Sequence, residues 1–214
     1  MIVSDSHRFI FWHIPRTGGS SISEALSPIT NKGHGSVSVG PSLHYGPMHV
    51  GIGSWVEPKE WLDYFWFAFV RNPFSRALSA YHARKGYYSQ SKLSRLQKGQ
   101  FKNAGIEVPI EELSFEQFLE NEVGNPCFIM LRQTQSDFLY KGECRDPDFV
   151  GRFENLTEDW ETICKTITWG GKRLGHLNNT NLETKDYRKH YNQRSRQIVQ
   201  DFFVEDMERW NYEF

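Results

Sequence analysis

Residues 8–22 read RFIFWHIPRTGGSSI and place an apolar run, a glycine turn and a helix start in one continuous stretch. The run from Arg8 to Ile14 is dense in aromatic and aliphatic residues and is closed by Pro15, which is typical of a buried strand. Ser20 to Leu26 has the length of a short helix that must end before Pro28. The stretch therefore predicts a buried strand that passes through a glycine turn into a helix.

A second stretch repeats this order at residues 66–83. Trp66 to Val70 reads WFAFV and predicts another buried strand. Asn72 and Pro73 then open a helix through about Ala83, because Asn is a good N-cap and Pro is tolerated at the first helical position. With a third strand at Phe149–Phe153, strands and helices alternate, which predicts an α/β fold whose central parallel sheet is covered on both faces.

The rest of the chain is predicted to be helices and two long polar segments. Ser114 and Gln117 form a capping-box pattern at the start of a helix that runs to about Glu122. The other expected helices cover Asn125–Leu139, a segment capped by Thr157 that ends near Ile167, and Asn192–Trp210. Residues 28–58 and 84–108 lack apolar periodicity and are expected to be loops or insertions within a single domain of residues 1–214.

Composition excludes several classes of protein. With 38% hydrophobic and 15% aromatic residues, the 214-residue chain is not intrinsically disordered. A net charge of −1 argues against a nucleic-acid binder, so an anion must be held by a local cluster. No apolar run reaches about 18 residues, and the first apolar run lacks the form of a signal peptide. The three cysteines (Cys127, Cys144 and Cys164) form no CxxC pair and are expected to be thiols, so the sequence favours a cytoplasmic protein.

The glycine turn has the residue types of a phosphate-binding loop. Gly18 and Gly19 allow backbone N–H groups to face an anion, and the helix that follows adds unpaired donors and a partial positive charge. Arg16 supplies a permanent cation, while the hydroxyl groups of Thr17, Ser20 and Ser21 supply further donors. The alternative is an ordinary strand–turn–helix corner. The loop lacks GxxxxGK[ST], so it is not a Walker A sequence, and no magnesium or other metal is expected.

A second pair of anion ligands is expected after the second strand. That strand delivers Arg71 to the carboxyl edge of the sheet, where open α/β folds bind ligands. Ser79 lies about two helical turns further on, so the two side chains are predicted to flank one phosphate. Taken singly, each residue is better explained as an ordinary surface arginine or helix serine; the phosphate assignment depends on the pair lying beside the first loop.

Both segments resemble the donor-binding loops of one enzyme family. HIPRTGGSSI at residues 13–22 is similar to the 5′-phosphosulfate loop, HIPKTGGTS, of sulfotransferases that use PAPS (3′-phosphoadenosine 5′-phosphosulfate). Residues 67–81 are similar to the 3′-phosphate loop, FxFVRNPxxRxxSAY, of the same family. The nearest branch includes the heparan sulfate 2-O-sulfotransferases and their bacterial relatives. Weaker similarity continues through QSDFL at 135–139, VGRFENL at 150–156 and the C-terminal WNYEF.

The resemblance implies a P-loop nucleotide-kinase-like, three-layer fold and a set of donor ligands. The 5′-phosphosulfate would be held by Arg16, Thr17, Gly18, Gly19, Ser20 and Ser21, and the 3′-phosphate by Arg71 and Ser79. Arg16 stands where the family usually has Lys, and the planar guanidinium differs from the compact ammonium in its reach to the bridging oxygen.

Transfer of a sulfuryl group to a hydroxyl also needs a base, for which His is the usual residue. His49, with His44 as the second choice, lies before a WxxYFxF block as a histidine does in bacterial relatives, although the flanking residues differ. Residues 28–58 and 84–108, with Tyr87, Tyr88 and the basic residues of the second segment, are expected to lie on the acceptor side, although a solvated polar insertion explains them equally well. The resemblance favours a saccharide acceptor over another hydroxyl-bearing metabolite. A small-molecule kinase and a non-catalytic, degenerate sulfotransferase remain the alternatives.

Overall fold

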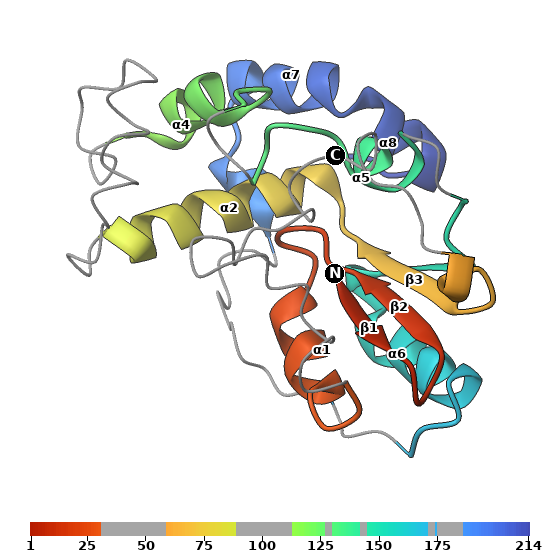
Figure 1. The fold of residues 1–214 in the computed structure, drawn as a ribbon. Coiled ribbons are helices and arrows are strands. Elements are labelled where there is room, and N and C mark those ends of the chain that lie inside the picture. The colour runs from red at the N-terminus through yellow and green to blue at the C-terminus, as the bar shows by residue number, and fades with distance from the viewer. Residues whose placement is uncertain (31–58, 89–112, 127–129, 142–144, 171–173, 175–185) are drawn as a thin grey trace. The chain divides into compact units, whose positions relative to one another are not determined.

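The computed structural model describes residues 1–30, 59–88, 113–126, 130–141, 145–170, 174 and 186–214. These residues group into two compact units, which we describe separately (Figure 1). The first unit comprises Met1–Arg71 and Gln135–Asn179, and the second comprises Asn72–Thr134 and Thr180–Phe214. The expectation of a single domain stays a prediction.

The first unit contains a four-stranded, mostly parallel sheet. Its strands β1 (Ile2–Ser4), β2 (Phe9–Trp12), β3 (Phe65–Val70) and β4 (Phe149–Arg152) lie in the order β1-β2-β3-β4. β2, β3 and β4 are parallel, which confirms the three predicted strands, whereas β1 pairs antiparallel with β2. β1 was not predicted, since three residues are too few to show a period of two.

One face of this sheet carries a cluster of buried aromatic residues. Phe9 and Phe11 of β2 and Phe67 and Phe69 of β3 pack in one cluster with side chains of two helices. The helices are α1 (Gly19–Leu26) and α6 (Leu156–Thr166), so both lie on this face. Side chains on the opposite face are also buried, namely Ile10, Trp12, Trp66, Ala68 and Val70. Burial on both faces explains why the strands are continuous apolar runs. A third layer, of helices on the opposite face, stays a prediction.

The second unit is helical. Its elements are α2 (Pro73–Tyr88), α4 (Phe115–Glu122), the 3₁₀ turn η7 (Tyr187–His190), α7 (Gln193–Phe202) and α8 (Val204–Trp210). Asn72 caps α2 as predicted, because its Oδ1 accepts the N–H of Phe74 at 3.0 Å. Helix α2 extends beyond the predicted end at Ala83, where Arg84 forms an ion pair of 2.8 Å with the buried Glu122 of α4. The predicted capping box of Ser114 and Gln117 is confirmed.

Two predictions about helix bounds are wrong in part. Within the described residues, the helix expected over 125–139 is limited to α5 (Gln135–Tyr140), because residues 130–133 form turns and bends. The Met130 carbonyl there accepts from the buried Arg76 at 2.8 Å. Thr157 does not cap α6, since the helix begins at Leu156 and Asn155 is at the N-cap.

The helix predicted over Asn192–Trp210 is divided by a bend at Phe203, whose backbone leaves the helical region. The division lets α7 bury Val199 and α8 bury Asp206. Asp206 is close enough to Arg76 for the two charges to interact, so the bend gives a buried cation a nearby carboxylate.

Candidate functional site

The turn between β2 and α1 has the backbone form of an anion-binding loop. Arg16 and Gly18 both lie in the left-handed region, with φ of 71° and 88°. A left-handed residue between right-handed ones turns neighbouring N–H groups toward a common point, which makes a concave site for an anion. Positive φ is uncommon for a residue with a side chain, so Arg16 is a position of local backbone strain of the kind found at ligand sites.

The hydroxyl of Thr17 closes this loop from inside. Its Oγ1 donates to the carbonyl of Ile14 at 2.9 Å, and the side chain is fully buried. The backbone N–H is therefore the group through which Thr17 would meet a ligand. Ser20 is exposed and Ser21 half-buried in the first turn of α1, and the Ser21 N–H donates to the Gly18 carbonyl at 3.1 Å.

His13 explains why residue 19 must be glycine. A Cβ placed on Gly19 would lie 1.9 Å from the Cδ2 of His13, an impossible approach. The imidazole also stacks on Phe11, with ring centroids 5.8 Å apart and planes 14° from parallel. Burial, assisted by the positive charge of Arg16, lowers the pKa of His13 to about 4, so the ring is neutral near pH 7. The sequence placed His13 at the end of a strand but did not reveal this contact.

Arg71 is held at the carboxyl end of β3 by its backbone and by its side chain. The amide of Gln135 bridges the Arg71 backbone, because its Oε1 accepts the Arg71 N–H and its Nε2 donates to the Arg71 carbonyl, both at 2.9 Å. The guanidinium donates from Nη1 to the Arg16 carbonyl at 3.4 Å and lies 4.0 Å above the ring of Phe153. Only 5% of Arg71 is exposed.

The first loop and Arg71 therefore lie together at the carboxyl edge of the sheet. β2 and β3 are parallel neighbours, so the residues that follow them emerge at the same edge. The edge combines the Arg71 guanidinium and the Arg16 backbone with the amino end of α1, an arrangement that attracts an anion. Burial lowers the pKa of Arg16, but arginine remains a cation in proteins.

The described structure does not test the other predicted ligands. Ser79 is buried in α2 of the second unit, so its pairing with Arg71 stays a prediction. His44 and His49 lie outside the described residues, as do the side chains of Tyr87 and Tyr88.

Sequence reasoning missed Gln135 and Phe153 as parts of this site. Both lie in segments that were noted only as weak similarities, and a single amide or aromatic residue has no spacing that marks it. Phe153 reaches Arg71 through the parallel pairing of β3 with β4, and Gln135 reaches it from the start of α5. Both contacts appear only in the folded chain.

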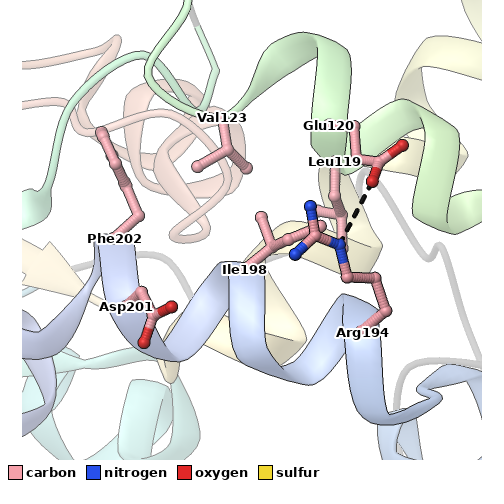
Figure 2. A pocket seen from close by; sticks show the side chains of 7 residues that line it. All are labelled: Leu119, Glu120, Val123, Arg194, Ile198, Asp201 and Phe202. Carbon is pink, nitrogen blue, oxygen red and sulfur yellow. Dashed lines mark hydrogen bonds and ion pairs between the residues drawn. The ribbon is translucent and has the colours of Figure 1, made fainter.

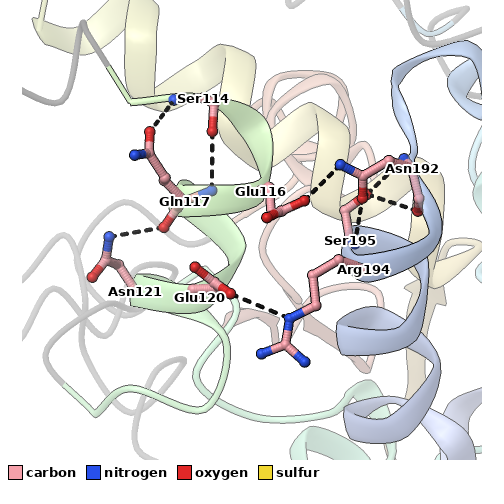
Figure 3. Close-up of polar contacts among 8 residues, drawn as sticks. All are labelled: Ser114, Glu116, Gln117, Glu120, Asn121, Asn192, Arg194 and Ser195. Carbon is pink, nitrogen blue, oxygen red and sulfur yellow. Dashed lines mark hydrogen bonds and ion pairs between the residues drawn. The ribbon is translucent and has the colours of Figure 1, made fainter.

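A shallow hollow of about 520 Å³ lies on the second unit, between α4 and α7 (Figure 2). Leu119, Val123, Ile198 and Phe202 form its apolar part. The helices that flank it are joined by polar contacts, in which Asn192 donates to Glu116 at 2.5 Å and Arg194 donates to Glu120 at 3.3 Å (Figure 3). These contacts hold α4 and α7 side by side and supply no chemistry of their own.

In the described part of the chain, no group of three or more His, Cys, Asp or Glu side chains is arranged to hold a metal ion. No helix in those segments is long and apolar enough to cross a membrane. Cys164 is a free, half-buried thiol.

Comparison with known proteins supports the chemistry suggested by the loop. A model of the sulfotransferase family matches residues 1–213, nearly the whole chain. No match is found among curated proteins or among solved structures. A loop built to hold an anion, on a mostly parallel sheet, agrees with a family that transfers sulfuryl groups. This chain belongs to the sulfotransferase family.

Proposed function

We propose that this sulfotransferase takes its sulfuryl group from PAPS and transfers it to a hydroxyl of a saccharide. The observation that carries the proposal is the loop of residues 14–19, left-handed at Arg16 and Gly18, with the guanidinium of Arg71 beside it. The donor has phosphate at two positions, and the site supplies two cations on adjacent strand ends. Gly19 lets the start of α1 pack closely against the His13 ring, and the helix that begins there offers its amino end to a phosphosulfate.

In this proposal the first loop stabilises the leaving group. The acceptor oxygen attacks sulfur, the bond between sulfur and the bridging oxygen breaks, and negative charge develops on the 5′-phosphate. Backbone N–H groups of Gly18 and Gly19, the hydroxyl groups of Ser20 and Ser21, and the Arg16 guanidinium are suited to hold that charge. Thr17 contributes its N–H, because its hydroxyl donates to Ile14.

Arg71 is proposed to bind the 3′-phosphate, and the sequence motif adds Ser79 to the same role. The Arg71 guanidinium is already oriented by Phe153 and by the Arg16 carbonyl, so little conformational freedom is lost on binding. We expect Arg71→Ala to weaken the binding of adenosine 3′,5′-bisphosphate by roughly 10- to 100-fold, the effect of losing a charged hydrogen-bond partner. Unchanged affinity in calorimetry would reject the assignment.

The proton of the acceptor hydroxyl is assigned to His49, with His44 as the second choice. His13 is unsuited to this role, since a pKa of about 4 makes it a weak base near neutral pH. We expect His49→Ala to keep bisphosphate binding and to lose turnover by roughly 10²- to 10⁴-fold. A His49→Ala enzyme with wild-type turnover, beside an inactive His44→Ala enzyme, would transfer the role to His44.

The decisive experiment is a sulfate-transfer assay with PAPS and a panel of saccharides, read by mass spectrometry. Transfer to a sugar hydroxyl supports the proposal and identifies the acceptor. Transfer only to small metabolites rejects the saccharide but keeps the donor. Magnesium-dependent binding of ATP without transfer would indicate a kinase-like enzyme, and bisphosphate binding without any transfer would indicate a degenerate member. We also propose that the enzyme is related to the heparan sulfate 2-O-sulfotransferase branch and that it is cytoplasmic.

A further inference from the structure

Phe153 touches both parts of the candidate donor site. It begins the 3₁₀ turn η5 (Phe153–Asn155), directly after β4, and is half-buried. The Cζ of Arg71 lies 4.0 Å from the centroid of its ring. A Cβ placed on Gly18 would lie 3.2 Å from its Cδ2 and 3.5 Å from its Cε2. The face of the ring therefore meets the Arg71 guanidinium, and one edge meets the first loop.

The backbone fixes Phe153 opposite Arg71. Val70 pairs with Arg152 in the parallel ladder of β3 and β4, so Arg71 and Phe153 are the next residues on each strand. The N–H of Arg152 donates to Oδ2 of Asp159 in α6 at 2.6 Å, which fixes the exit of β4. The position of the ring is thus set by the sheet and by α6, and does not depend on a ligand.

We infer that Phe153 is a positioning residue of the donor site, one that holds the Arg71 guanidinium toward the first loop. The inference rests on the proposed function. An aromatic face attracts a guanidinium and excludes water from one of its faces, while the N–H groups lie in the guanidinium plane, directed outward. Stacking therefore orients Arg71 without competing for the hydrogen bonds that a phosphate accepts. Because the edge of the same ring lies against Gly18, Phe153 holds the guanidinium at a fixed place next to the loop that follows β2.

The test is calorimetry of adenosine 3′,5′-bisphosphate on a set of variants. Phe153→Leu removes the aromatic face and keeps an apolar side chain, and we expect it to weaken binding by roughly 3- to 30-fold. Phe153→Tyr keeps the face and should bind within about twofold of wild type. Phe149→Leu is the matched control, because Phe149 lies on the same strand and packs against the core shared with α1 and α6. That control should leave affinity unchanged.

A double-mutant cycle separates positioning from general damage. In an Arg71→Ala background, Phe153→Leu should cause little further loss of bisphosphate affinity, because the group that it orients is gone. Adenosine 5′-phosphate, which lacks the 3′-phosphate, should bind wild type and Phe153→Leu equally. In the transfer assay, Phe153→Leu should raise KM for PAPS and leave kcat within about twofold.

The outcomes distinguish the two proposals. If wild type does not bind the bisphosphate, the proposed function fails. If wild type binds it and Phe153→Leu binds as tightly, or if the losses from Phe153→Leu and Arg71→Ala simply add, the inference about Phe153 fails alone. Thermal unfolding of each variant shows whether Phe153→Leu is folded. Should it unfold, Phe153→Tyr and Phe153→Trp carry the test, and a loss of affinity in the folded Phe153→Tyr variant would overturn the inference.

Discussion

The first loop and the end of β3 each present an arginine, but they fix it by different means. At the loop the backbone determines the geometry, through left-handed residues at 16 and 18 and a glycine pressed against His13. At the end of β3 side chains determine it, because Gln135 bridges the Arg71 backbone and Phe153 lies under the guanidinium.

This contrast indicates how each region can vary. A loop held by its backbone tolerates changes in side-chain chemistry but not in side-chain volume at its glycines. A guanidinium held by side chains depends on the identity of its neighbours. The replacement of the usual Lys by Arg16 lies in the first class, whereas Arg71, Gln135 and Phe153 belong to the second.

The largest effect is expected from Gly19→Ala. The new Cβ would meet the His13 ring at 1.9 Å, so either the loop or the imidazole must move. We expect a loss of about 3 kcal/mol in the free energy of unfolding, at the upper end for overpacking, together with loss of bisphosphate binding. Urea unfolding and calorimetry measure the two effects. The double variant His13→Ala with Gly19→Ala should recover part of the stability, and if it recovers none, His13 is not what excludes a side chain at residue 19.

The next effect is expected from Gln135→Ala. Removing the amide leaves the buried N–H and carbonyl of Arg71 without the bonds that Gln135 makes, which costs about 1–3 kcal/mol of stability. Bisphosphate affinity should fall as well, because the backbone of Arg71 is no longer fixed. The exposed Gln197, whose amide donates to Asp201 on the surface of α7, provides the control as Gln197→Ala. Equal effects at the two positions would refute the special role of the Gln135 bridge.

A smaller effect is expected in the pH dependence of the free energy of unfolding. The pKa of His13 falls from 6.5 to about 4 in the folded protein because of burial, so the unfolded chain binds more protons between these values. Its contribution to stability is complete above pH 6.5 and is lost as the pH falls toward 4. His13→Gln should therefore lose less unfolding free energy than wild type between pH 7 and pH 5. His190→Gln, at an exposed histidine, controls for removal of an imidazole. Parallel pH profiles for wild type and His13→Gln would contradict the burial of this ring.

The sequence predicted those features of the site that follow from local patterns. Continuous apolar runs predicted the parallel strands, and Gly18-Gly19 with its hydroxyl neighbours predicted the loop at the end of β2. Contacts between distant segments were not predictable, since Arg71 meets Gln135 across 64 residues and Phe153 only through the pairing of β4. Similarly, Arg76 in the second motif is fully buried, and its Nη2 donates to the Met130 carbonyl 54 residues away.

The smallest effect is expected from Arg16→Lys, which restores the usual residue of the family loop. Lysine can adopt the same left-handed backbone at the same cost, and the carbonyl that accepts from Arg71 is unchanged by the substitution. Bisphosphate affinity should therefore stay within about threefold of wild type, since a point charge replaces a planar one at a partly buried site. A loss as large as that of Arg71→Ala would mean that the Arg16 guanidinium is itself a principal ligand. The loop would then depend on its side chain, as the end of β3 does, and the contrast between the two regions would no longer hold.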